Sequence, residues 1–189
     1  MQRYMQSWRE KMKIILWAVL ILTGFAASAR AQQSITVDFS TAQLWHLYGD
    51  GQRDLYPVVL PRMAAQHSMN FSQPVLGQLI HADYKPTWWP TANMRRKDSS
   101  LPSRVSYGQP GHPIGLYRLR IAWINPSSPA FWKPVRIHGG AQTRDLYKKR
   151  SAGCVRMLDE DIERLVSNIK RASQRGEAEV QVSFGFFSG

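Results

Sequence analysis

Hydrophobic and polar residues alternate along several short stretches of the chain, a pattern typical of half-buried β-strands. The first stretch runs from Ile35 to Phe39, with apolar residues at every second position. Strands are also predicted at residues 44–48, 55–60, 75–82, 115–124, 135–137 and 178–184. Gly49-Asp50-Gly51 predicts a tight turn, and Pro57 places its own strand at a sheet edge, because proline lacks a ladder donor.

A helical period replaces this alternation only after residue 154. Ile162, Leu165, Val166 and Ile169 recur at the spacing of an apolar helix face, and Gly176 is a suitable end. Asp159 is predicted to cap the helix through its carboxylate. Seven prolines between residues 61 and 113 favour ordered loops over a long helix. The basic run at 148–150 is predicted to be a solvated loop. The fold class is therefore mostly β, a β-rich α+β domain with one main helix.

Length and charge indicate the number of domains and the kind of partner. The 189 residues suit a single domain, and 25 basic residues against 13 acidic ones give a net charge of +12. Residues 1–31 carry five of the basic residues and one acidic residue, so the remainder is still basic at +8. Such a surface attracts polyanions in general, including nucleic acid, an anionic envelope surface or an acidic polymer.

The N-terminus has the organisation of an export signal. A basic segment ends at Lys13, the apolar run Ile14–Ala26 follows, and small residues at 27–31 offer cleavage sites. We therefore predict a signal peptide over residues 1–31, with an uncleaved N-terminal anchor as the alternative. Export argues against nucleic acid as a partner. It also leaves Cys154 as the one cysteine of an exported chain, a pattern that indicates a reactive thiol or intermolecular pairing.

Cys154 lies in a stretch that contains the other parts of a thiol active site. His138 precedes it by sixteen positions, and Arg156 follows by two. A neighbouring imidazolium lowers the pKa of a thiol, and a Cys–His pair can form a thioester. The small residues Ser151 to Gly153 allow backbone amides to approach a substrate closely, and Arg156 can bind a carboxylate.

Plainer interpretations of these residues stay open on residue type alone. A single cysteine is most often a small buried apolar side chain, and a His-Gly pair is common in turns. Spacing does not show that the two meet in space. A metal site has little support, because the chain has no second cysteine and no pair of histidines at ligand spacing.

The motif His138-Gly139, a spacer, and then Ser151-Ala152-Gly153-Cys154-Val155-Arg156-Met157 resembles the L,D-transpeptidase (YkuD-type) catalytic domain, in its periplasmic Gram-negative branch. Segments 35–38, 86–91, 93–96 and 113–117 resemble other parts of that family. The resemblance covers residues 34–184, and we expect a catalytic domain over 34–186. The family usually has histidine where this chain has Ala152, and threonine is common where it has Gly140.

The resemblance implies a single β-sandwich or barrel domain and a defined chemistry. Cys154 would attack a peptidoglycan tetrapeptide stem and form a thioester, and His138 would act as base and then as acid. Orienting or oxyanion roles fall to Gly139, Gly153 and Ser151, and substrate binding to Arg156, Trp88 and Trp89. The two tryptophans are equally compatible with packing under a loop. No metal or organic cofactor is implied.

The implied partners are peptidoglycan stem peptides and an amine acceptor on another stem or a protein. The resemblance also implies an exported, periplasmic protein that meets the membrane only through its signal segment. Two alternatives remain: an L,D-carboxypeptidase or amidase that uses water as acceptor, and a non-catalytic peptidoglycan-binding protein. Ala152 keeps the last alternative open, and the presence of both Cys154 and His138 argues against it.

Overall fold

The computed structural model describes residues 32–62, 74–124 and 136–187. Residues 31–189 form one compact unit. The predicted export signal and Val135 lie outside the described residues. In the ranges that are described, no helix is long and apolar enough to span a bilayer.

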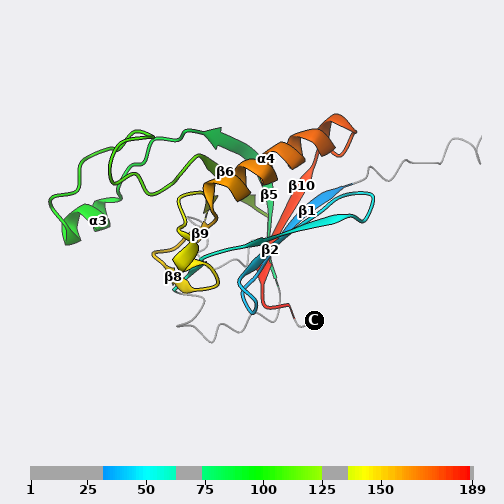
Figure 1. The fold of residues 1–189 in the computed structure, drawn as a ribbon, viewed down its shortest axis with the longest axis horizontal. Helices are drawn as coiled ribbons and strands as arrows, with labels where there is room; N and C mark the ends of the chain where they lie inside the picture. Colours follow the sequence, from blue (N-terminus) through cyan, green and yellow to red (C-terminus); the bar gives the residue numbers. More distant parts are fainter. Residues whose placement is uncertain (1–31, 63–73, 125–135, 188–189) are drawn as a thin grey trace, which may run out of the picture. The chain divides into compact units, whose positions relative to one another are not determined.

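An eight-stranded sheet forms the body of the described unit, in the order β3-β2-β1-β10-β5-β6-β7-β9 (Figure 1). A separate two-stranded sheet pairs β4 with β8. The strands are β1 (Gln33–Asp38), β2 (Gln43–Leu47), β3 (Arg53–Pro57), β4 (Leu60–Pro61), β5 (Val75–Tyr84), β6 (Tyr117–Trp123), β7 (Ile137–His138), β8 (Lys149–Ser151), β9 (Val155–Arg156) and β10 (Val180–Gly185). The helices are α3 (Ala92–Lys97), the 3-10 turn η2 (Thr143–Asp145) and α4 (Asp159–Gln174).

The core lies between the sheet and α4. Alternate residues of the central parallel pair β1 and β10 are buried, among them Ile35, Val37 and Val182. The predicted apolar stripe of α4 packs into the same cluster, with Ile162 and Leu165 fully buried. Alternation in the strands and the 3.6-residue period in the helix therefore point one face of each element into a shared core.

Most of the predicted elements are confirmed. Gly51 has a positive φ of 85° in the turn between β2 and β3, and β3, which contains Pro57, is an edge strand. Alternation in β6 is also confirmed, since Leu119 and Ile121 are buried while Arg118 and Arg120 lie on the opposite face. The mostly β fold with one main helix is the fold observed.

Three local expectations were wrong. The basic run at 148–150 is not only a loop, because Lys149 and Arg150 begin β8, which pairs with β4. The proline-rich region contains the six-residue helix α3, capped by the Thr91 hydroxyl, which accepts a hydrogen bond from the Met94 amide. Leu158, not Asp159, is the N-cap of α4. Two or three residues of strand, or six of helix, are too few to show a period in sequence.

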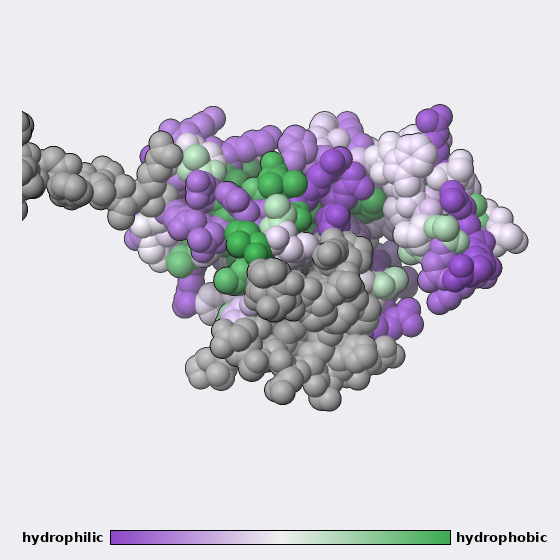
Figure 2. All heavy atoms as spheres, turned by 180° about the vertical axis from the view of Figure 1, so that it is seen from behind, coloured by the Kyte–Doolittle hydropathy of each residue, from purple (hydrophilic) through white to green (hydrophobic). Residues whose placement is uncertain are grey.

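The surface of the described part is mainly polar, with small apolar areas between polar ones on the face shown in Figure 2. The large exposed apolar side chains belong partly to β5 and the segment that follows it, and include Leu76, Ile80, Tyr84 and Trp89. These residues lie on the outward positions of β5 or on the loops, so the buried core is complete without them.

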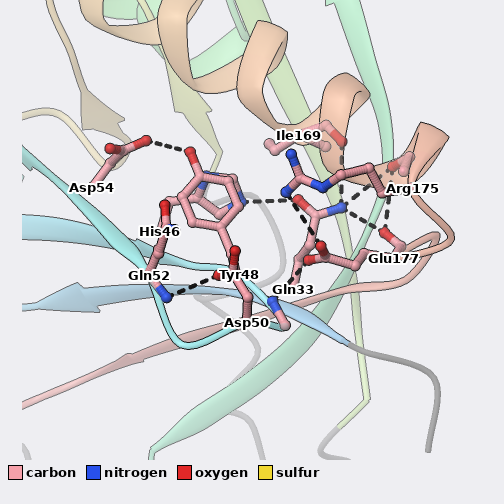
Figure 3. Close-up of polar contacts among 11 residues, drawn as sticks. Gln33, His46, Tyr48, Asp50, Gln52, Asp54, Ile169, Arg175 and Glu177 are labelled. Atoms are coloured by element: carbon pink, nitrogen blue, oxygen red, sulfur yellow. Dashed lines mark hydrogen bonds and ion pairs between the residues drawn. The ribbon is translucent and has the colours of Figure 1, made fainter.

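A buried polar network joins the start of β1 to the end of α4 (Figure 3). The side-chain amide of Gln33 donates hydrogen bonds to the carbonyls of Glu177 and Ile169, at 2.5 and 3.3 Å, and its oxygen lies 2.9 Å from His46 Nε2. Because Gln33 Oε1 can only accept, Nε2 of His46 carries the proton and Nδ1 has no hydrogen-bond partner. Burial lowers the pKa of His46 to about 4, against the opposing effects of Asp54 and Glu177.

Stability should fall as the pH drops from about 6.5 to about 4. His46 and His138 both have a pKa of about 4 in the folded chain, against an ordinary value of 6.5. In this window the unfolded chain binds protons that the folded chain does not, so each histidine can remove up to about 3 kcal/mol of stability. Urea unfolding at several pH values measures this. His46→Gln should flatten the fall, whereas His81→Gln, at an exposed position of β5, should leave it unchanged.

Candidate active site

The register of two short parallel strands sets the geometry of the site. His138 of β7 pairs with Arg156 of β9, and Ile137 pairs with Val155. The ladder continues on both sides, with hydrogen bonds from Val155 N to Arg136 O and from Met157 N to His138 O, both 2.9 Å. Ile137 and Val155 are fully buried in the core. Because neighbouring residues alternate in direction, His138 and Arg156 share the opposite face.

Cys154 belongs to the same face. It precedes Val155 by one residue and Arg156 by two, and the bond between Val155 N and Arg136 O sets Cys154 beside Arg136. Cys154 directly precedes β9 and is diagonal to His138 if the register is extended by one residue. The thiol is free and partly buried. The register thus places His138 next to Arg156 and the segment of Cys154 beside β7, and the pairing of Cys154 with His138 stays a prediction.

The hydrogen bonds of His138 identify its tautomer. Nδ1 lies 2.7 Å from the carbonyl oxygen of Gly139 and 3.3 Å from that of Ile114. Carbonyl oxygens can only accept, so Nδ1 carries a proton. Burial lowers the pKa of His138 to about 4, aided by the charges of Arg156 and Arg118 and opposed by the two carbonyls. At neutral pH the ring is uncharged, and its Nε2 is free to accept a proton.

The thiol is also uncharged at rest. Burial raises the pKa of Cys154, and this effect exceeds the opposing ones of a backbone hydrogen bond with Arg136 and the charges of Arg136, Arg156 and Arg118. The expectation that an imidazolium holds a thiolate ready does not fit this resting state. Burial of both groups disfavours both charges, so the pair is a neutral thiol and a neutral imidazole.

Ser151 holds the turn that presents the thiol. Its buried hydroxyl donates to the carbonyl oxygen of Cys154 and accepts a 3.4 Å hydrogen bond from the amide of Gly153. A Cβ added at Gly153 would meet no atom within 4 Å, so the space beside Gly153 is open. Ala152, which precedes it, is exposed.

Asp159 has a role that the sequence did not reveal. Its Oδ1 accepts hydrogen bonds from the amides of Leu116, at 3.0 Å, and Gly140, at 2.9 Å. The carboxylate fills the space where side chains at Gly115 and Gly139 would be, since added Cβ atoms would lie 2.1 and 2.0 Å from Oδ1. Asp159 thereby joins the segment before β6 to the segment after His138. Its partners lie 43 and 19 positions away, so local sequence patterns carried no signal for this contact.

The structure does not bring Trp88 and Trp89 into this cluster. Both lie in the segment between β5 and β6, where backbone hydrogen bonds join Trp88 to Val105 in both directions at 2.9 Å. The side chain of Trp89 is 60% exposed. Among the described contacts, neither indole meets Cys154 or His138. Their predicted role in substrate binding stays a prediction.

The arrangement is suited to nucleophilic acyl transfer. The thiol of Cys154 directly precedes β9, the strand paired with that of His138, whose Nδ1 carries the proton, and the charges of Arg118 and Arg156 act on both groups. Within the described ranges, no group of three or more histidine, cysteine, aspartate or glutamate side chains could hold a metal ion.

Comparison with known proteins shows the family of the chain. The family model of the YkuD L,D-transpeptidase catalytic domain matches residues 32–182. The chain belongs to this family. Among curated proteins, it is 34% identical over 88 residues to the probable L,D-transpeptidase ErfK/SrfK of Escherichia coli, and 32% identical over 88 residues to the probable L,D-transpeptidase YcfS of the same organism. Each match covers 44% of this chain and 25% of the relative, so it spans only a quarter of their length.

The fold is also that of solved L,D-transpeptidases. L,D-transpeptidase 3 from Mycobacterium tuberculosis superposes with a TM-score of 0.50 at 13% sequence identity, over 81% of this chain and 60% of that one. At this identity the likeness concerns the fold alone. It agrees with the β-rich architecture that the family resemblance implied.

Alkylation of Cys154 by iodoacetamide should become faster by about tenfold for each pH unit between pH 6 and 9, because only the thiolate reacts and the pKa of Cys154 is raised. Mass spectrometry of the modified protein gives the rate at each pH. His138→Gln should keep the same slope, since the imidazole is already neutral. A rate that levels off below pH 8 would show a preformed ion pair and contradict this assignment.

Gly139→Ala should lower the free energy of unfolding by about 1–3 kcal/mol, because its new methyl group would overlap the Asp159 carboxylate. Asp159→Ala should cost a similar amount, since it leaves two amides without their acceptor. The double variant should cost less than the sum, because removal of the carboxylate makes room for the methyl group. Additive losses in urea unfolding would disprove the contact.

Proposed function

We propose that this protein is an exported cysteine L,D-transpeptidase that acts on peptidoglycan tetrapeptide stems through a thioester on Cys154. The observation that carries the proposal is the tautomer of His138. Its Nδ1 proton is directed at the Gly139 and Ile114 carbonyls, which leaves Nε2 as the base on the face that holds Cys154. Family membership supports the reaction class, and the predicted signal at 1–31 supports export.

In the first half-reaction, Nε2 of His138 takes the thiol proton as Cys154 Sγ attacks the carbonyl of the stem's third residue. The carbon–nitrogen bond to the terminal D-residue then breaks, and His138 returns the proton to the departing amine. The imidazolium exists only between taking up this proton and returning it. The carbonyls of Gly139 and Ile114 stabilise it, because both act to raise the pKa of His138.

In the second half-reaction, an acceptor amine attacks the thioester carbonyl. His138 removes a proton from the amine, the carbon–sulfur bond breaks, and the thiol is restored with that proton. Water in place of the amine would give the tripeptide. The acceptor thus decides between cross-linking and hydrolysis.

The remaining residues hold the reacting groups and the substrate. Amides of Gly153 and Cys154 are the proposed donors to the developing oxyanion, with Ser151 fixing the turn that carries them. Arg156, next to His138 in the register, binds an anionic group of the stem. Trp88 and Trp89 are proposed to contact the stem from the segment between β5 and β6. The catalytic domain is proposed to span residues 34–186.

The protein should convert a tetrapeptide stem with a third-residue diamino acid into a thioester on Cys154, and then into a cross-linked or exchanged product when an amine is supplied. Cys154→Ser should abolish turnover. His138→Gln should lower the acylation rate by roughly 10²–10⁴-fold, the usual contribution of a general base. Intact-protein and product mass spectrometry measure both steps.

His46→Gln is the matched control, because His46 is equally buried and neutral but lies in the network near β1. At a temperature where both variants are folded, it should retain the wild-type rate. Tripeptide with no amine product would assign the carboxypeptidase reaction instead. Absence of any thioester or product would favour the non-catalytic peptidoglycan-binding alternative.

A further inference from the structure

We propose that Arg118, oriented by Asp83, is a second carboxylate-binding residue of this site and acts from the side of His138 opposite to Arg156. Its ligand is a carboxylate of the donor stem, so the inference rests on the proposed function and adds a determinant of substrate specificity to it. Neither residue belongs to the motif around Cys154.

The strand register places these residues in one row. Asp83 of β5 pairs with Arg118 of β6, Arg118 pairs with His138 of β7, and His138 pairs with Arg156 of β9. Directly paired residues point to the same face of a sheet. The neighbouring row, in which Leu119 pairs with Ile137, faces the core, since both residues are fully buried. Arg118 and Arg156 therefore flank His138 on the side that carries Cys154.

The charge of Arg118 acts on both reactive groups. It lowers the pKa of His138, and it lowers the pKa of Cys154, each alongside Arg156. Adjacent strands are about 4.8 Å apart, so the stem of Arg118 begins one strand from His138. The charge effects place Arg118 near both reactive groups, so an anionic group of a substrate beside them would be attracted to it.

Asp83 fixes the direction of Arg118. One carboxylate oxygen accepts hydrogen bonds from Arg118 Nε, at 2.8 Å, and Arg120 Nε, at 2.8 Å, and lies 2.7 Å from an Arg118 terminal nitrogen. The side chain of Asp83 is only 13% exposed, and that of Arg118 is 24% exposed. Burial alone would raise the pKa of Asp83, but hydrogen bonds from Arg120 and Arg118 outweigh it and lower that pKa. Asp83 is therefore an ionised positioning residue.

Among the described ion pairs, Asp83 is one carboxylate shared by Arg118 and Arg120, and Arg156 adds positive charge near the thiol. A partly buried excess of arginine favours an anionic ligand, and a guanidinium fork is well matched to a carboxylate. The donor stem carries such a group close to the bond that breaks, because the leaving D-residue ends in an α-carboxylate. A diamino acid at the third position can supply a second one.

Binding of three stems tests the proposal: one with free carboxylates, one amidated at its terminus and one amidated on the third residue's side chain. Calorimetry in the Cys154→Ser background separates binding from turnover. Arg118→Gln should weaken binding of the free stem by roughly 10–100-fold, the range for a lost charged hydrogen bond. In the parent, each amidation should lower the affinity for the stem. In Arg118→Gln, one of these two losses of affinity should disappear, which identifies the carboxylate that Arg118 binds. Arg118→Lys should restore part of the discrimination.

Asp83→Asn should give a smaller loss in the same direction, since the arginine stays but is less well oriented. Arg164→Gln removes an exposed arginine that is paired with Asp161 on α4, and it should leave all three affinities unchanged. If Arg118→Gln keeps the penalty of both amidations, or if the parent binds none of the stems, the proposal is overturned. The transpeptidase proposal is tested separately, because it fails if the protein with Cys154 present forms no thioester with the stem.

Discussion

The alternation of side chains across β5, β6, β7 and β9 is the constraint on which the core and the candidate site both depend. One row, which includes Leu119, Ile137 and Val155, faces the core and is fully buried. The adjacent row faces the opposite way and carries His138 and Arg156. A shift of one residue in either strand would exchange the rows and bury the arginine in place of Val155. Burial of the apolar row thus determines which face of the sheet carries His138 and Arg156.

A second constraint keeps His138 in one orientation. The Asp159 carboxylate, at the start of α4, binds the amides of Leu116 and Gly140, and these segments supply or adjoin the carbonyls that accept from Nδ1 of His138. Glycine at 139 is required because the carboxylate occupies the space of its Cβ. The start of α4 is therefore linked to the His138 ring through backbone amides and carbonyls. This explains why an acidic residue at a helix start is important here although it caps no helix.

Local periodicity was enough to predict the long strands and the apolar face of α4, whereas the pairing of Cys154 with His138 was inferred from their chemistry and from the family resemblance. It was not enough for β8 and β9, which have three and two residues and gain their hydrogen bonds only from partners distant in sequence. The contacts of Asp159 join α4 to two loops that are distant in sequence. The row from Asp83 to Arg156 depends on the pairing of four strands. Such pairings are set by tertiary packing, so residue type and spacing could not supply them.

A neutral thiol and imidazole near several arginines can be explained by the binding of an anionic substrate. Burial, aided by the charges of Arg156 and Arg118, lowers the pKa of His138, which makes it a weak base before substrate binds. A stem carboxylate bound between them would offset that charge, and the basicity of Nε2 would rise as the substrate arrives. Proton transfer from Cys154 would then be favoured only in the complex. In the empty protein, the thiol would stay protonated and less open to oxidation or alkylation.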